Sequence, residues 1–184
     1  MDKKKIEEAV RLFLEGIGED PAREGLVDTP ARVSAMCDEI FGGYEKNAAI
    51  PLAKTFTSET TDMVVEKDIQ FYSVCEHHLL PFFGKISIGY IPGDKVVGLS
   101  KLARTVEVYA RRAQIQEKLT AEIANAIQKE LNPKGVIVLA KAEHMCMSMR
   151  GVSKPGTTTV TYKTTGVFDT DNSLKELFFK MIGV

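Results

Sequence analysis

Two short segments of the chain concentrate side chains that can bind a metal. Cys75-Glu76-His77-His78 and His144-Met145-Cys146 together hold all three histidines and two of the three cysteines. Cys75 and His78 have the C-x-x-H spacing with which one tight turn can direct a thiolate and an imidazole to the same ion. Cys146 can add a second thiolate from elsewhere in the fold. Thiolate and imidazole ligands together favour zinc over other metals.

Spacing alone leaves two kinds of zinc site open. A structural site closes with four protein ligands, whereas a catalytic site uses three and keeps one position open. His77 and His78 point to opposite sides of an extended chain, so only one of them can readily share an ion with Cys75. His144 and Cys146 lie two residues apart on an expected strand and would face the same way, which keeps a closed Cys2His2 site possible. Such a site would belong to a binding or scaffold protein.

The residues around these clusters favour the catalytic alternative. A purely structural site needs no surplus histidines, no carboxylate at Glu76 and no guanidinium at Arg150. Imidazoles that titrate near neutral pH, beside a metal that activates water, are what hydrolysis with proton transfer requires.

A second set of residues has the chemistry of an anion site. Ser100, Lys101 and Arg104 stand at the start of an expected helix. The amino end of a helix presents free amide protons and a partial positive charge, so cations added there favour a phosphate chain. Gln116 and Glu117 follow at the junction of two helices. An ionised carboxylate only accepts hydrogen bonds, which matches the paired N–H donors of guanine and not adenine.

These residues need a scaffold, and 184 residues suffice for one buried core. We expect a single domain over 1–184, with a helical part over 1–60 and a catalytic core over 61–184. The net charge of -1 argues against a protein that coats nucleic acid or an anionic membrane. No apolar run reaches the length of a membrane span. The odd number of cysteines, without an apolar leader, indicates a reducing compartment, so we expect a cytoplasmic protein.

Hydrophobic periodicity predicts an α+β fold. Helical spacing of apolar residues covers residues 5–15, 29–41, 100–112, 117–131 and 174–181. Strands are predicted over residues 63–75, 85–90, 135–146 and 157–165. Strand pairs interrupted by helices favour an antiparallel sheet over a doubly wound parallel one. Such a small sheet has edges that need covering, which favours a homo-oligomer.

Four ordered motifs resemble signatures of the GTP cyclohydrolase I family. They are Cys75-Glu76-His77-His78-Leu79-Leu80-Pro81, Gly98-Leu99-Ser100-Lys101-Leu102-Ala103-Arg104, Gln114-Ile115-Gln116-Glu117-Lys118-Leu119-Thr120 and His144-Met145-Cys146-Met147-Ser148-Met149-Arg150-Gly151. Asp28-Thr29-Pro30-Ala31-Arg32-Val33 and Gly166-Val167-Phe168 extend the resemblance from the second helix to the carboxyl end.

The resemblance implies hydrolysis of GTP to formate and 7,8-dihydroneopterin triphosphate, the entry to pterin and folate synthesis. It also implies the tunnelling fold, in which an antiparallel sheet carries helices on one side and the subunit sheets join into a barrel. The expected assembly is a decamer of two pentamers. No nucleic acid or membrane partner is expected.

The resemblance also assigns roles to residues. One zinc ion per subunit would be held by Cys75, His78 and Cys146, with one position left for water. His144 would then give a proton to the purine and His77 would exchange protons with the ribose. Substrate contacts are expected from Arg32, Glu76, Ser100, Lys101, Arg104, Gln116, Glu117 and Arg150, with the cations on the triphosphate and with some contacts crossing a subunit boundary.

Overall fold

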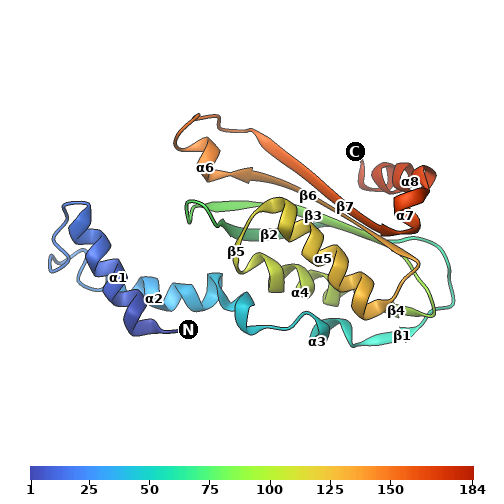
Figure 1. Ribbon diagram of the computed structural model, residues 1–184, viewed down its shortest axis with the longest axis horizontal. Coiled ribbons are helices and arrows are strands. Elements are labelled where there is room, and N and C mark those ends of the chain that lie inside the picture. The colour runs from blue at the N-terminus through green and yellow to red at the C-terminus, as the bar shows by residue number, and fades with distance from the viewer. The chain divides into compact units, whose positions relative to one another are not determined.

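The computed structural model describes residues 1–184 as two compact units, Met1–Gly42 and Gly43–Val184 (Figure 1). The first unit is a pair of packed helices, α1 (Lys3–Gly16) and α2 (Thr29–Ile40). The Asp2 side chain caps α1 by accepting a hydrogen bond from the Lys5 amide. Pro30 stands in the first turn of α2, where its missing N–H costs nothing. Both predicted helices are confirmed, as is the irregular connection between them.

The second unit contains a five-stranded sheet whose strand order is β5-β2-β3-β6-β7. Every neighbouring pair is antiparallel except β2 with β5. The α+β fold predicted from the order of elements is therefore confirmed. The strands are β2 (Val64–Cys75), β3 (Pro81–Ile91), β5 (Ala113–Gln114), β6 (Gly135–His144) and β7 (Thr158–Gly166).

Two long helices, α4 (Leu99–Ala110) and α5 (Gln116–Leu131), pack on one face of this sheet (Figure 1). Alternate β6 residues such as Val136 and Val138 point into the core beneath them, as the period of a strand requires. The intervening residues of β6 face the other side. There they pack with the carboxyl-terminal helices α7 (Val167–Thr170) and α8 (Asn172–Ile182).

A small second sheet was not predicted. It pairs β1 (Thr55–Thr57) with β4 (Lys95–Val97), and it follows the 3-10 helix η1 (Gly42–Glu45) and the one-turn helix α3 (Ala49–Leu52). Each of these elements is too short to show a period in the sequence. No helix of the chain combines the length and the apolar character that crossing a bilayer demands.

Two predicted boundaries were wrong. The helix predicted to start at Ser100 begins at Leu99 after Gly98, so Ser100 lies inside its first turn. The strand expected to run through Cys146 ends at His144, and Cys146 lies in the one-turn helix α6 (Met145–Ser148). The reason is pairing: β6 runs along β3 as far as His144 opposite Phe82, and β3 begins only one residue earlier. Beyond that point no backbone partner remains.

Candidate functional site

The site is built where β2 and β6 end and β3 begins. Cys75 is the last residue of β2, and its amide and carbonyl bond to Leu80 and Leu79 across the turn that follows. Leu79 takes the left-handed conformation, with φ 53°. This turn carries the first metal-binding segment and returns the chain into β3. Since β3 pairs with β6, it brings the second segment alongside.

Three donor side chains converge at this end of the sheet. The ligand atoms of Cys75, His78 and Cys146 all lie within 4.8 Å of one another. His77 Nδ1 and His78 Nδ1 are 3.8 and 4.0 Å from Cys75 Sγ, so the turn brings both rings to the same sulfur. Cys75 is buried, whereas His78 is exposed.

This donor set fits zinc. Two thiols and an imidazole are the ligands that zinc takes most readily. Burial and the adjacent Cys75 sulfur raise the pKa of the Cys146 thiol. A divalent cation bound there would supply positive charge that favours the Cys146 thiolate.

His144 lies beside this group but has partners of its own. Its Nε2 is 2.8 Å from Gln116 Oε1, and its ring stacks on Phe82 with centroids 4.6 Å apart and planes 3° apart. Burial lowers the pKa of His144, while the nearby Glu117 carboxylate acts in the opposite direction. The ring is thus held in one orientation within reach of a carboxylate.

The two residues expected at the guanine edge differ in exposure. Gln116 is buried in the first turn of α5, and its side-chain nitrogen lies 3.0 to 3.1 Å from three acceptors on β6 and β7. Glu117 is exposed. The carboxylate of Glu117 is therefore the group of the pair that is open to a ligand.

The segment from Cys146 to Arg150 is held to the sheet by a residue that the sequence did not single out. Glu143 accepts hydrogen bonds from Ser148 Oγ at 2.6 Å and from the Gly156 amide at 3.2 Å. These bonds lower the pKa of Glu143. They close the loop that carries Cys146 and the exposed Arg150, which lies near enough to favour the Cys146 thiolate. A lone glutamate at the end of a strand has no distinctive pattern, so nothing in the sequence indicated it.

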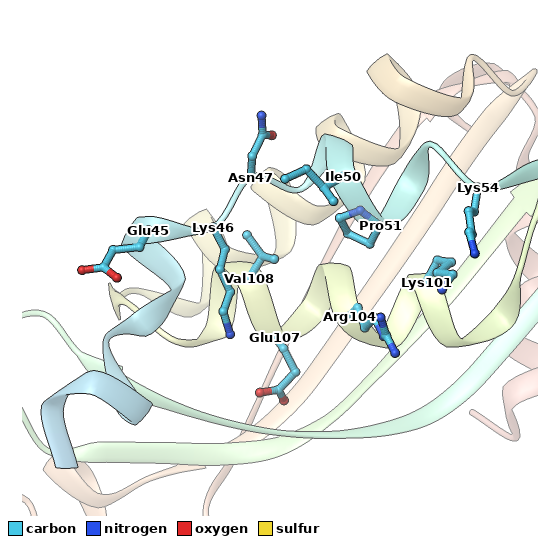
Figure 2. Close-up of a pocket in the computed structure, with 10 residues that line it drawn as sticks. All are labelled: Glu45, Lys46, Asn47, Ile50, Pro51, Lys54, Lys101, Arg104, Glu107 and Val108. Carbon is cyan, nitrogen blue, oxygen red and sulfur yellow. The ribbon is translucent and has the colours of Figure 1, made fainter. Parts of the chain in front are cut away.

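Two of the predicted phosphate-binding cations, Lys101 and Arg104, line a separate cavity of about 720 Å³, whereas Arg32 and Arg150 do not. Figure 2 shows Lys101 and Arg104 of α4 facing this cavity together with Lys46 and Lys54, which flank α3. None of the four cations forms an ion pair within 4.0 Å. The sequence did not indicate Lys46 and Lys54, because the short α3 that brings them to α4 has no period.

Lys101 lies near the start of α4, at the end of the helix away from the metal-binding group. The helix ends at Ala110 and leads into β5, where Gln114 pairs with Cys75. Lys101 stands nine residues before that end, about 14 Å along the axis at 1.5 Å per residue. Along this helix, Lys101 is therefore remote from the metal-binding group of its own chain.

The remaining predicted residues are solvent-exposed. Glu76 lies in the turn after β2, and Ser100 lies in the first turn of α4. Arg32 belongs to the first unit, where it forms a 3.1 Å ion pair with Asp28 one helical turn away.

Comparison with known proteins shows similarity to one family over the length of the chain. The sequence profile of the GTP cyclohydrolase I family matches residues 6–183. GTP cyclohydrolase 1 of Finegoldia magna and that of Clostridium perfringens are each 55% identical to this chain over 184 residues, which is 100% of both proteins in each comparison. GTP cyclohydrolase 1 of Streptococcus sanguinis is 56% identical over 183 residues, again 100% of each.

Likeness among solved structures is weaker. The crystal structure of the archaeosine synthase QueF-Like in the apo form has a TM-score of 0.48 and 21% identity to this chain. The match covers 59% of this chain and 97% of the archaeosine synthase chain.

Proposed function

The chain belongs to the GTP cyclohydrolase I family, and we propose that it hydrolyses GTP to formate and 7,8-dihydroneopterin triphosphate, the first step of pterin and folate synthesis. The observation that carries the proposal is the convergence of Cys75, His78 and Cys146 beside His144. Three donors with a separate histidine alongside match a hydrolytic metal centre better than a closed structural one.

We assign Cys75, His78 and Cys146 as the zinc ligands. Zinc held there would supply a Lewis acid that activates water for attack on a purine carbon near neutral pH. His144 remains outside the ligand set because its ring nitrogens do not belong to the group of donor atoms formed by Cys75, His78 and Cys146. The rest of the chemistry then falls to side chains that move protons and hold the substrate.

Two histidines have proton-transfer roles in this proposal. His144 donates a proton to N7 of the purine as water adds at C8, which makes the five-membered ring easier to open. Its orientation on Phe82 fixes where that proton is delivered. His77, exposed beside the metal-binding group, exchanges protons with the ribose ring oxygen when the sugar opens. Both rings lie close to the turn that begins at Cys75, which supports the separate roles given to His144 and His77.

The base and the sugar meet residues at the amino ends of two helices. Glu117 accepts hydrogen bonds from the adjacent N–H donors of guanine, a pattern that adenine lacks. Gln116 lies next to Glu117 in the first turn of α5. Ser100 lies near the ribose. Glu76, in the turn that carries Cys75 and His78, is a further substrate contact in this proposal.

The triphosphate occupies the cation-lined cavity. Lys101 and Arg104 are joined there by Lys46 and Lys54, and four unpaired cations match a chain of phosphates. Glu107 also borders the cavity, but its carboxylate is paired with Arg111 at 2.9 Å, so its charge is already compensated. Arg150 and Arg32 supply two further cationic side chains that bind the triphosphate in this proposal.

Because Lys101 lies about 14 Å along α4 from the end of the helix that leads to its own metal-binding group, we propose that each active site combines two chains. The cavity of one subunit would face the metal-binding group of a neighbour. The outer edge of β7, and the part of β2 beyond its short pairing with β5, have no partner strand in a single chain. Pairing along these edges would join the sheets into a barrel, in a decamer of two pentamers.

Mixed oligomers test the shared site. A Cys146→Ser chain and a Lys101→Ala chain are each expected to be inactive alone. Refolded together, they are expected to regain activity, because some sites then combine an intact metal-binding group with an intact cavity. Activity that stays absent, while mass spectrometry confirms mixed oligomers, would place the whole site within one chain.

The reaction itself is tested on zinc-loaded protein incubated with GTP. Formate is assayed enzymatically and the pterin by fluorescence after oxidation, with ATP as the control nucleotide. Equal amounts of the two products from GTP, and none from ATP, are expected. Formate without pterin would indicate a different purine hydrolase, and neither product with zinc tightly held would indicate a structural site.

A further inference from the structure

We propose that Gln116 is a positioning residue that keeps the proton of neutral His144 on Nε2, so that the nitrogen presented to the substrate is Nδ1. The inference rests on the proposed function for its catalytic meaning, but its structural content stands on hydrogen bonds alone. It assigns the Gln116 side chain to His144 and leaves the guanine edge to Glu117.

The orientation of the Gln116 amide follows from its surroundings. Gln116 Nε2 is 3.0 Å from the carbonyl oxygen of Ala140 and 3.1 Å from that of Thr159. Both carbonyls can only accept hydrogen bonds. Turning the amide over would set its oxygen against two carbonyl oxygens in a buried place, which is a costly arrangement. The nitrogen therefore faces the strands, and Oε1 faces His144.

A chain of hydroxyl groups gives the same orientation independently. Thr120 Oγ1 lies 2.7 Å from the backbone carbonyl of Gln116, so the single Thr120 hydroxyl proton is donated there. The 2.8 Å contact between the hydroxyls of Thr120 and Thr161 must then take its proton from Thr161. Thr161 Oγ1 has no second proton to give, so it accepts from Gln116 Nε2 at 3.1 Å.

The tautomer of His144 is the consequence. Gln116 Oε1 has no proton, and it is 2.8 Å from His144 Nε2, so Nε2 must carry the hydrogen. No protein group hydrogen-bonds Nδ1. Turning the ring by 180° would put the carbon Cε1 in place of Nε2 and lose the bond to Gln116, so this bond fixes the ring orientation within the stack on Phe82.

This arrangement suits repeated proton donation from a single atom. Nδ1 of the neutral ring first takes up a proton from water, and when it passes that proton to purine N7 the neutral tautomer with hydrogen on Nε2 is restored. That is the form that Gln116 stabilises. Donation from Nε2 instead would break the bond to Gln116 and leave a buried amide oxygen unpaired. The transferred proton therefore leaves from Nδ1, while the Nε2 proton stays with Gln116.

Solid-state NMR of zinc-loaded protein labelled with carbon-13 and nitrogen-15 histidine tests the assignment. The chain has only three histidines, so His144 can be identified by its loss in His144→Asn. At a pH where the ring is neutral, wild type is expected to show one tautomer, with hydrogen on Nε2. A proton on Nδ1, or a zinc-dependent shift that marks His144 as a ligand, would overturn the proposal.

Two glutamine variants test whether Gln116 is the residue that fixes the tautomer of His144. In Gln116→Met the ring loses its acceptor, and a mixture of tautomers is expected, with kcat lowered by up to about 100-fold, the lower end of what a positioned acid contributes, and KM for GTP little changed. Gln114→Met makes the same change at another buried glutamine, whose nitrogen bonds to Tyr109 and Glu122, and should leave the His144 signals as in wild type. A single tautomer in Gln116→Met, or an equal disturbance in Gln114→Met, would contradict the role given to Gln116.

If Gln116→Met folds poorly, a third variant, Gln116→Glu, tests the same hydrogen bond. In Gln116→Glu the carboxyl oxygen that replaces the amide nitrogen must be protonated to donate to the carbonyls of Ala140 and Thr159, and the other oxygen still faces His144. The Nε2 proton of His144 should therefore remain, and its appearance on Nδ1 would refute the proposal. Turnover of GTP by wild type is measured separately. An inactive wild type with the expected tautomer would refute the proposed function and leave the hydrogen-bond assignment standing.

Discussion

Replacing His144 by alanine and Cys146 by serine should separate two roles that the sequence alone left ambiguous. In the structure, Cys146 belongs to the donor group and His144 bonds to Gln116. We therefore expect Cys146→Ser to lose both zinc and turnover. His144→Ala should retain one zinc per chain while kcat falls by about 10²- to 10⁴-fold, the usual contribution of a positioned acid or base.

The cost of His144→Ala in folding free energy can be worked from its contacts. Leaving the buried Gln116 oxygen unpaired costs about 1–3 kcal/mol. Losing the stack on Phe82 costs about 0.5–1.5 kcal/mol more. The total of roughly 1.5–4.5 kcal/mol is below the 5–15 kcal/mol stability typical of a domain, so the variant should fold.

The assay combines zinc content by plasma mass spectrometry, denaturant unfolding and GTP turnover on the same preparations. Zinc bound to His144→Ala with normal affinity supports the three-ligand site. Zinc lost from His144→Ala to the same extent as from Cys146→Ser would make His144 a ligand and refute the open-site assignment.

Three further outcomes are expected. Lys46→Ala and Lys54→Ala should each raise KM for GTP several-fold at low salt, with the effect shrinking as salt screens the cavity; an unchanged KM would remove them from the triphosphate site. Glu143 has a pKa below its ordinary value of 4.5, so its stabilising effect is present above that pH and lost as the pH falls through the folded value. The difference in melting temperature between wild type and Glu143→Gln should therefore shrink on acidification, and a constant difference in calorimetry would contradict this. A Cβ on Gly84 would lie 2.0 Å from the carbonyl oxygen of Lys141 on β6, so Gly84→Ala should separate β3 from β6 and lower the yield of folded protein, whereas Gly42→Ala, with open space, should not.

The helices and strands could be predicted because most are long enough to show a period. The alternating residues of β6 and the apolar stripe of α5 follow directly from burial on one face. The point where β6 ends could not be predicted, since it depends on where its partner β3 begins. That boundary places Cys146 on a helical turn and not on the strand.

The candidate site was predictable in part for the same reason. Its metal-binding residues lie in two short segments with distinctive residue types, and the C-x-x-H spacing expresses local geometry. Lys46 and Lys54 reach their cavity only through tertiary packing. The bond between Gln116 and His144 joins residues 28 apart in sequence, and no spacing rule links a helix start to a strand end.

X-ray absorption at the zinc edge tests the central claim most directly, because it counts the protein ligands of the bound metal. For zinc-loaded wild type, the account predicts two sulfur ligands and one imidazole, from Cys75, Cys146 and His78. Two sulfurs and two imidazoles would contradict it and indicate a closed structural site.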